Sequence, residues 1–353
     1  MASYVLAIVP VYNGNPSVVI TAVKSILSQN YRYLRIVVID DCSEASIYPL
    51  LSKEFSCYSQ VTLLRNNKNI GFAQTLNKAL ELVTDEVYLL VLEQDCELVN
   101  VDYVAKALKY FHDDSVGVVS GENLLPPDTE LSLVKRIFVK HLCEDVHDVS
   151  VVEVGFSLLK ADVFRIDVLK EVGGFESSAK WKFASEEHLV SYKIRSSGYK
   201  IIKDSSLRFR GYWGRQEKLW QNLRKEAIYG RGLGWAWARM QSDLEIGDSA
   251  QLKSKRFSRI IQMQYVLLSV FSVFLFLYSP LMSLTLLSLT SLVQLVYLIR
   301  RASIFSHVKE KLLFITTGFL RSWVYIPNFF FGILYGFMFK CKKKIPTSSK
   351  ISK

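Results

Sequence analysis

The chain has 353 residues, half of them apolar, and its 44 lysines and arginines against 33 acidic residues give a formal net charge of +11. A positive charge suits nucleic acid, anionic lipid and phosphorylated substrates alike. However, the long uncharged apolar runs all lie after residue 259, with basic clusters beside them. That distribution indicates a membrane and argues against a nucleic-acid binder.

The five cysteines are odd in number and contain no Cys-x-x-Cys pair. This argues against a disulfide framework or a zinc site and for a reducing compartment. No basic segment precedes the first apolar run, so no signal peptide is predicted. We expect the part of the chain before the long apolar runs to stay in the cytosol.

The first eighty residues alternate between apolar runs typical of strands and the periodic spacing typical of helices. The predicted strands are 4–11, 34–39 and 61–64, and the predicted helices are 17–28, 45–57 and 71–82. This alternation predicts a parallel sheet with crossover helices. The second strand ends in Asp40 and Asp41, whose carboxylates either accept hydrogen bonds from a ribose or base or cap a helix.

The stretch 87–98, VYLLVLEQDCEL, combines a buried strand with acidic residues at its carboxyl end. Its apolar run predicts a central strand, which ends in Glu93, Gln94 and Asp95. Clustered acids repel one another unless a cation lies between them, and oxygen ligands suit Mg²⁺ or Mn²⁺. The alternative is that Asp95 and Glu97 cap a helix near 101–111.

Further along, a short strand is predicted at 116–119 and another at 151–159. Residues 121–150 between them lack periodicity, and the HLCEDVH segment within them matches no common metal site, so we expect a mobile loop there. Residues 216–240 resemble an amphipathic helix rich in Trp and Arg, suited to a bilayer interface or the floor of an acceptor site.

Residues 260–299 carry no charge and are divided by Ser279-Pro280 into two legs of about twenty residues, the length of one bilayer crossing. Basic residues flank both ends, which predicts a hairpin with both ends cytosolic. A second apolar stretch, 312–339, contains Arg321 and Pro327. Because a charge inside lipid is costly, we expect this stretch to be broken, interfacial or re-entrant.

Four motifs resemble those of family 2 glycosyltransferases, most of all the rhamnosyltransferase-like branch: IVPVYNG (8–14), VVIDDCS (37–43), NNKNIGFAQTLNKAL (66–80) and LEQDCEL (92–98). The resemblance implies an α/β fold of the GT-A class (nucleotide-diphospho-sugar transferase), with a mostly parallel sheet and flanking helices, over residues 1–215. The expected remainder is an interface helix and linker (216–256), transmembrane helices (257–340) and a basic tail (341–353).

The resemblance also implies roles for individual residues. Asp95 matches the metal-binding position of the family's acidic D-x-D-like motif, and Glu93 replaces the usual first Asp. Contacts to the nucleotide sugar are implied for Pro10, Tyr12, Asp40, Asp41, Asn69, Gly71, Asn77, Glu93, Gln94 and Gly155.

Residues 172–201 resemble the family segment that carries a Glu-Asp pair, which assigns the catalytic base to Glu187, with Glu186 as the neighbouring alternative. A base must reach the proton of the acceptor hydroxyl, but two acids are also favoured at any solvated helix N-terminus. Where the family often has a His, residues 207–215 carry arginines that either clamp a diphosphate or cover the sheet edge.

The sequence therefore predicts a membrane-anchored, metal-dependent inverting glycosyltransferase of the hexosyl- or deoxyhexosyltransferase type, with its catalytic domain on the cytosolic face. It would move a sugar from a nucleoside diphosphate to a hydroxyl of a lipid-linked or growing glycan, with Mg²⁺ or Mn²⁺ as cofactor. Two alternatives stay open: a polyprenyl-phosphate sugar synthase, whose phosphate acceptor needs no base, and a non-catalytic membrane scaffold that retains the fold.

Overall fold

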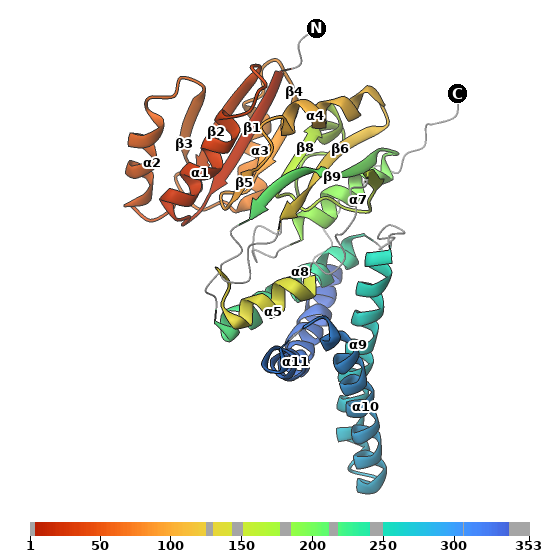
Figure 1. The fold of residues 1–353 in the computed structure, drawn as a ribbon. Coiled ribbons are helices and arrows are strands. Elements are labelled where there is room, and N and C mark those ends of the chain that lie inside the picture. The colour runs from red at the N-terminus through yellow and green to blue at the C-terminus, as the bar shows by residue number, and fades with distance from the viewer. Residues whose placement is uncertain are drawn as a thin grey trace, which may run out of the picture.

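The computed structural model describes residues 4–124, 130–142, 151–176, 185–211, 218–240, 250–305 and 307–338. Figure 1 shows an α/β domain at the N-terminal end and, beyond it, a group of long helices from the C-terminal third. The predicted linker at 243–249 and the basic tail at 341–353 lie outside the described residues.

A nine-stranded sheet forms the centre of the α/β domain in the described part of the chain. Its order is β3-β2-β1-β4-β8-β6-β9-β5, and β7 pairs with β9. The strands are β1 (Tyr4–Val11), β2 (Leu34–Asp40), β3 (Val61–Arg65), β4 (Glu86–Leu92), β5 (Cys96–Leu98), β6 (Val116–Leu124), β7 (Val151–Glu153), β8 (Ala161–Arg165) and β9 (Lys200–Gly211).

Strands β1 to β4 are parallel to one another, as the strand–helix alternation predicts. The other half differs, because β8 is antiparallel to β4 and to β6, and β5 and β7 are antiparallel to β9. The expected mostly parallel sheet is thus a mixed sheet. An apolar run marks a buried strand but does not fix its direction.

Helices cover both faces of the sheet (Figure 1), and each face has its own apolar core. Alternate residues of β1 supply the two cores, with Val9 on one side and Ile8 on the other. The helices of the domain are α1 (Pro16–Leu27), α2 (Ile47–Phe55), α3 (Phe72–Glu81), α4 (Tyr103–Leu108), α6 (Ile166–Glu171) and α7 (Glu186–Ser196), with a 3₁₀ turn η1 (Lys109–His112).

The predicted strand at 151–159 is wrong beyond its first three residues. Strand β7 ends at Glu153, and β8 begins only at Ala161. The loop between them contains Leu159 in a left-handed conformation, with φ 55°. A residue in that conformation cannot continue a β-strand. The apolar pattern of the segment does not reveal the left-handed residue.

The helix-capping alternative for Asp95 and Glu97 is also wrong. Asp95 directly precedes β5 and Glu97 lies within it, and the next helix, α4, begins only at Tyr103. Glu97 instead pairs with Arg210 of β9, with 2.7 Å between Oε1 and Nη1. Arg210 therefore covers a sheet edge, which is one of the two roles predicted for the arginines of that segment.

The stretch 121–150 is not a loop throughout, because Leu133–Leu142 forms helix α5. Arg136 forms an ion pair of 2.9 Å with Glu310 at the start of α11. Ile137 packs among apolar residues of the C-terminal helices. The expected mobile loop is thus attached, over its described part, to the C-terminal helices. Residues 143–150, and most of the HLCEDVH segment with them, lie outside the described residues.

The C-terminal helices are α8 (Leu219–Arg239), α9 (Ala250–Leu275), α10 (Pro280–Arg301) and α11 (Val308–Met338), with a short 3₁₀ helix η3 (Ala302–Ile304). Figure 1 shows α9 and α10 as an antiparallel hairpin that projects away from the sheet. The turn falls at Ser279, whose hydroxyl caps α10 by accepting the N–H of Met282, with Pro280 next.

Helix α10 is the one described helix that is long and apolar enough to cross a membrane; Ile260–Leu275 of α9 is apolar but shorter. Helix α11 is continuous through Pro327, so the expected break in this stretch is not a break of the helix. Arg321 is 4% exposed, and its guanidinium donates to Glu226 of α8. We expected a break because a lone charge is costly in lipid, and the ion pair with Glu226 means that the charge of Arg321 is not alone.

Helices α8 and α11 approach so closely that only glycine fits at several of their contacts. A Cβ on Gly234 would lie 1.9 Å from the carbonyl oxygen of Phe329, and one on Gly332 would lie 2.1 Å from that of Arg231. Small residues let helix backbones touch in this way. The two helices therefore form one compact unit next to the α/β domain.

Candidate active site

The carboxyl ends of β1, β2 and β4 meet at one edge of the sheet, and direct hydrogen bonds join their loops. The N–H of Tyr12 donates to Gln94 Oε1 at 3.0 Å, and Gln94 Nε2 donates back to the Tyr12 carbonyl at 3.2 Å. The N–H of Asn13 donates to Ser43 Oγ at 2.8 Å. The structure thus brings together the first loop, the Asp pair and the acidic motif.

The two aspartates after β2 have different surroundings. Asp41 accepts hydrogen bonds from Asn66 Nδ2 and from the N–H groups of Ile70 and Gly71, at 2.8–2.9 Å. Asp40 is fully buried, accepts the N–H of Ser43 and lies 3.4 Å from Arg65. Both therefore organise the backbone of the loops that frame the edge.

The remaining predicted contact residues differ in how directly they face the edge. Asn69 lies in the loop held by Asp41 and has a buried side-chain oxygen without a hydrogen-bond partner. Pro10 is buried within β1. Asn77 forms two hydrogen bonds of 2.8 Å with the backbone of Phe175, so it joins α3 to the turn before that residue.

Glu93 and Asp95 form the described group whose oxygens fit a hard metal ion. Possible ligand atoms of these two residues and Cys96 all lie within 4.8 Å of one another. Burial raises the pKa of the Cys96 thiol well above its ordinary value, and the nearby carboxylates add to this. Mg²⁺ and Mn²⁺ prefer oxygen ligands to a thiol, so the carboxylate oxygens are the candidate ligands here.

Lys160, which sequence reasoning did not single out, lies inside this acidic edge. Its Nζ is 2.7 Å from Glu93 Oε2, and its carbonyl accepts the N–H of Glu93 at 2.9 Å. Burial disfavours the ammonium, but the carboxylate of Glu93 outweighs it and raises the pKa of Lys160 above its ordinary value. The lysine is therefore charged at neutral pH.

Glu186 and Glu187 begin α7. The charge of Glu93 acts on Glu186 and that of Lys160 on Glu187, which shows that both acids lie near the same edge. Burial raises the pKa of Glu186 to about 7, and the charges of Glu187 and Glu93 add to it. Burial also tends to raise the pKa of Glu187. However, the hydrogen bond from His188 and the charge of Lys160 outweigh burial and lower that pKa below its ordinary value.

His188 is a second residue that sequence reasoning missed. Its Nδ1 lies 3.1 Å from Glu187 Oε1, and its ring stacks on Phe156 with centroids 4.8 Å apart. Phe156 directly follows Gly155, so the stack brings the Gly155 loop against the first turn of α7. A histidine that directly follows an acid pair is the sequence signal that could have pointed to it.

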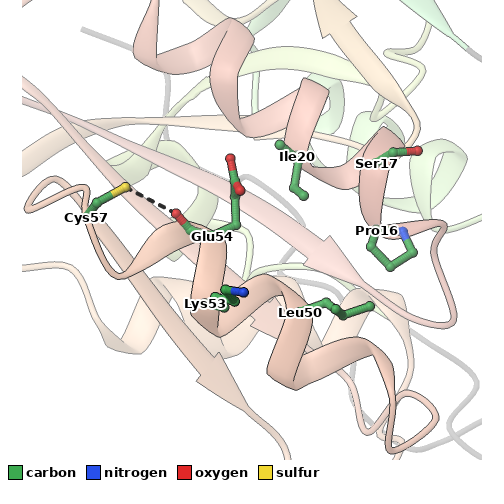
Figure 2. A pocket seen from close by; sticks show the side chains of 7 residues that line it. All are labelled: Pro16, Ser17, Ile20, Leu50, Lys53, Glu54 and Cys57. Atoms are coloured by element: carbon green, nitrogen blue, oxygen red, sulfur yellow. Dashed lines mark hydrogen bonds between the residues drawn. The ribbon is translucent and has the colours of Figure 1, made fainter.

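The described non-glycine residues with positive φ all lie beside this edge: Asn13, Cys42, Leu159 and Ser185. Each is adjacent in the chain to Tyr12, Asp41, Lys160 or Glu186. Left-handed backbone is unfavourable for such residues and tends to occur at functional sites. In contrast, Figure 2 shows a groove between α1 and α2 that contains none of the predicted site residues. It is lined by Pro16, Ser17, Ile20, Leu50, Lys53, Glu54 and Cys57.

Residues 6–160 match the sequence profile described as Glycosyl transferase family 2. A comparison with curated proteins finds no match. Among solved structures, the mannosyltransferase PcManGT from Pyrobaculum calidifontis, in complex with GDP-Man and Mn²⁺, is similar with a TM-score of 0.56 and 17% identity. The match covers 97% of this chain and 89% of that chain.

The structure of GalNAc-T7 with UDP, GalNAc and Mn²⁺ is similar with a TM-score of 0.50 and 16% identity, over 72% of this chain and 54% of that chain. At such identities the likeness shows a shared fold. The profile match covers residues 6–160 alone, and the two solved structures share the fold of this chain.

Proposed function

We propose that this protein transfers a sugar from a nucleoside diphosphate sugar to an acceptor hydroxyl, with inversion at the anomeric carbon. The observation that carries the proposal is the facing pair of acidic groups: Glu93 and Asp95 after β4, and Glu187 at the start of α7. In the first group Asp95 suits a divalent ion that would neutralise the leaving diphosphate, and Glu187 suits the acceptor proton.

Glu187 has the properties of a general base. Its low pKa keeps it ionised at neutral pH, and His188 orients its carboxylate. It takes the acceptor proton while the acceptor oxygen bonds to the anomeric carbon and the bond from that carbon to the diphosphate breaks. Bound at Asp95, Mg²⁺ or Mn²⁺ supplies positive charge for the leaving diphosphate.

The donor is a nucleoside diphosphate hexose or deoxyhexose. The sequence resemblance to the rhamnosyltransferase-like branch favours a deoxyhexose. GDP-mannose is the second candidate, because the similar structure of PcManGT holds GDP-Man. A donor panel read out by release of nucleoside diphosphate distinguishes the two.

We further propose that the α9–α10 hairpin anchors the enzyme in a membrane, next to a lipid-linked or growing glycan acceptor. The hairpin reverses the burial pattern of a water-soluble protein. The buried residues of α10 are mostly polar, including Ser283, Thr290 and Gln294, whereas its large apolar residues are exposed. Polar contacts between helices and an apolar exterior suit lipid.

Two such polar contacts join α10 to its neighbouring helices. Ser283 Oγ donates to the Ser272 carbonyl of α9 at 2.6 Å, and Gln294 Nε2 donates to Ser322 Oγ of α11 at 3.2 Å. Basic residues at both ends of the hairpin favour the cytosolic face for the α/β domain. Tethering concentrates the enzyme and a lipid-linked acceptor on one surface.

The decisive test compares Asp95→Ala, Glu187→Gln and the control Glu54→Gln in purified full-length protein. Glu54 is an acid in the α1–α2 groove that pairs with Lys24. We expect turnover to fall about 100-fold or more for the first two variants, the scale of losing a general base, and to stay unchanged for the control.

The outcomes separate the alternatives. Full transfer by both site variants contradicts the proposal. Loss only with Asp95→Ala points to a phosphate acceptor, as in a polyprenyl-phosphate sugar synthase, which needs no base. Nucleotide binding without any turnover across the donor panel points to a scaffold that retains the fold.

A further inference from the structure

Lys160 occupies a position that the proposed function has not yet used. Its positive charge acts on four groups of the acidic edge: it opposes the burial that raises the pKa values of Glu93, Cys96 and Tyr229, and it helps to lower that of Glu187. Tyr229 belongs to α8. The Lys160 Nζ lies 2.7 Å from Glu93 Oε2, just after β4, and its charge also acts on residues of β5, α7 and α8.

The backbone around Lys160 is built to keep it there. The preceding residue, Leu159, is left-handed with φ 55°, and the N–H groups of both residues donate to the buried Asp162 carboxylate. The Lys160 carbonyl is held by the N–H of Glu93. An unfavourable backbone conformation that persists under such constraints is typical of a functional position.

The carboxylates around Lys160 indicate what its positive charge does. Glu93, Asp95 and Glu187 bring three carboxylates to a place that must accept an anionic diphosphate. The ion pair with Lys160 neutralises Glu93 and leaves Asp95 as the carboxylate directed to a metal ion. About a quarter of the Lys160 side chain is exposed, so the residue borders solvent at the edge where the diphosphate is proposed to bind.

We propose that Lys160 binds the donor's diphosphate and, by its ion pair, keeps Glu93 from competing for the metal ion. This inference rests on the proposed function. It predicts two effects of opposite sign when the ammonium is removed: a divalent ion binds more tightly, because Glu93 becomes free to ligate it, and a nucleoside diphosphate binds more weakly. A residue that only supports the fold would move both affinities in the same direction or neither.

The test uses full-length Lys160→Met and Lys160→Arg, with Lys170→Met on the exposed end of α6 as the matched control. Titration calorimetry measures Mn²⁺ alone, and then GDP and UDP at saturating Mn²⁺. For Lys160→Met we expect Mn²⁺ to bind about tenfold tighter and the preferred nucleotide about tenfold weaker, the scale of one charge at short range near a surface. Lys160→Arg should retain most of the nucleotide affinity, and Lys170→Met should match the wild type.

Thermal unfolding of each variant shows whether it is folded. Unchanged affinities in folded Lys160→Met, or a fall in both, overturn the role of Lys160 while the proposed function stands. Wild-type protein that binds neither Mn²⁺ nor either nucleotide overturns the proposed function, and this inference with it.

Discussion

Glu186 and Glu187 are neighbours in the chain, yet their surroundings drive their pKa values in opposite directions. Burial and the adjacent acids favour the neutral form of Glu186, whereas His188 and Lys160 favour the charged form of Glu187. At neutral pH Glu187 is therefore ionised, whereas Glu186 is close to half protonated. This separation supports Glu187 as the base more strongly than their positions in the sequence do.

The pKa of about 7 for Glu186 predicts a pH dependence of stability. A glutamate in the unfolded chain ionises near pH 4.3, so between that pH and 7 the folded protein holds a proton that the unfolded chain has released. The stabilisation is complete below pH 4.3 and is lost as the pH rises through 7.

Glu186→Gln removes this dependence, so its melting temperature should rise relative to the wild type between pH 5.5 and 8. Melting curves across that range provide the measurement, with Glu54→Gln as the control. Parallel curves for the wild type and Glu186→Gln would contradict the pKa assigned to Glu186.

Individual residues of the site were predictable where they follow a buried strand. Asp41, Gln94 and Asp95 were singled out because an apolar run ends just before them, and the structure brings their loops together. Lys160 and His188 were not, because their positions depend on a left-handed loop residue and on a helix start that leave no periodic signal. Resemblance, and not periodicity, pointed to Glu187.

At the scale of single elements, the buried pair of Glu226 on α8 and Arg321 on α11 explains how a charge is accommodated within an apolar helix. The two residues are 7% and 4% exposed. Removing one partner leaves the other charge buried and alone, which is far more costly than removing both.

We therefore expect Glu226→Leu alone to destabilise the protein by about 3–5 kcal/mol, and the double variant Glu226→Leu/Arg321→Met to recover most of that loss. Unfolding of detergent-solubilised protein measures both. The exposed Lys24–Glu54 pair is the matched control, where Glu54→Gln should change stability by less than about 1 kcal/mol. Equal losses in the single and double variants would show that Arg321 does not depend on Glu226.

Helices and strands were predicted well where a strong hydrophobic periodicity begins or ends at a clear boundary residue. Helix α1 is one example, because it is predicted over 17–28 and runs from Pro16 to Leu27, with Asn15 as its N-cap. Helix α5 and the continuous α11 were not foreseen, because both depend on partners distant in the chain. Those partners are Glu310 for α5 and Glu226 for α11.

For the whole molecule, the central prediction concerns the exposed apolar surface of α10. Leu289 is 57% exposed near the middle of that helix, and Leu50 on α2 is 53% exposed. If α10 lies in lipid, Leu289→Arg inserts a charge among hydrocarbon tails at a cost of about 3 kcal/mol, whereas Leu50→Arg replaces one solvent-facing residue by another.

Fractionation after high-salt washing measures the difference. We expect Leu289→Arg to lower the membrane-bound fraction and Leu50→Arg to leave it unchanged. A wild-type protein that washes off the membrane, or a Leu289→Arg variant that stays bound like the wild type, would contradict the anchoring role of the hairpin.

The glycine contacts between α8 and α11 bear on how far the acidic edge stands from a bilayer. Backbones that touch at Gly234 and Gly332 cannot slide past one another without a clash, and Tyr229 on the same α8 lies within electrostatic reach of Glu93 and Glu187. The reacting groups would then sit at a constant height above the lipid headgroups. Acceptors would be selected by whether their hydroxyl reaches that height, so the length of the acceptor's stem, as well as its chemistry, would decide what is glycosylated.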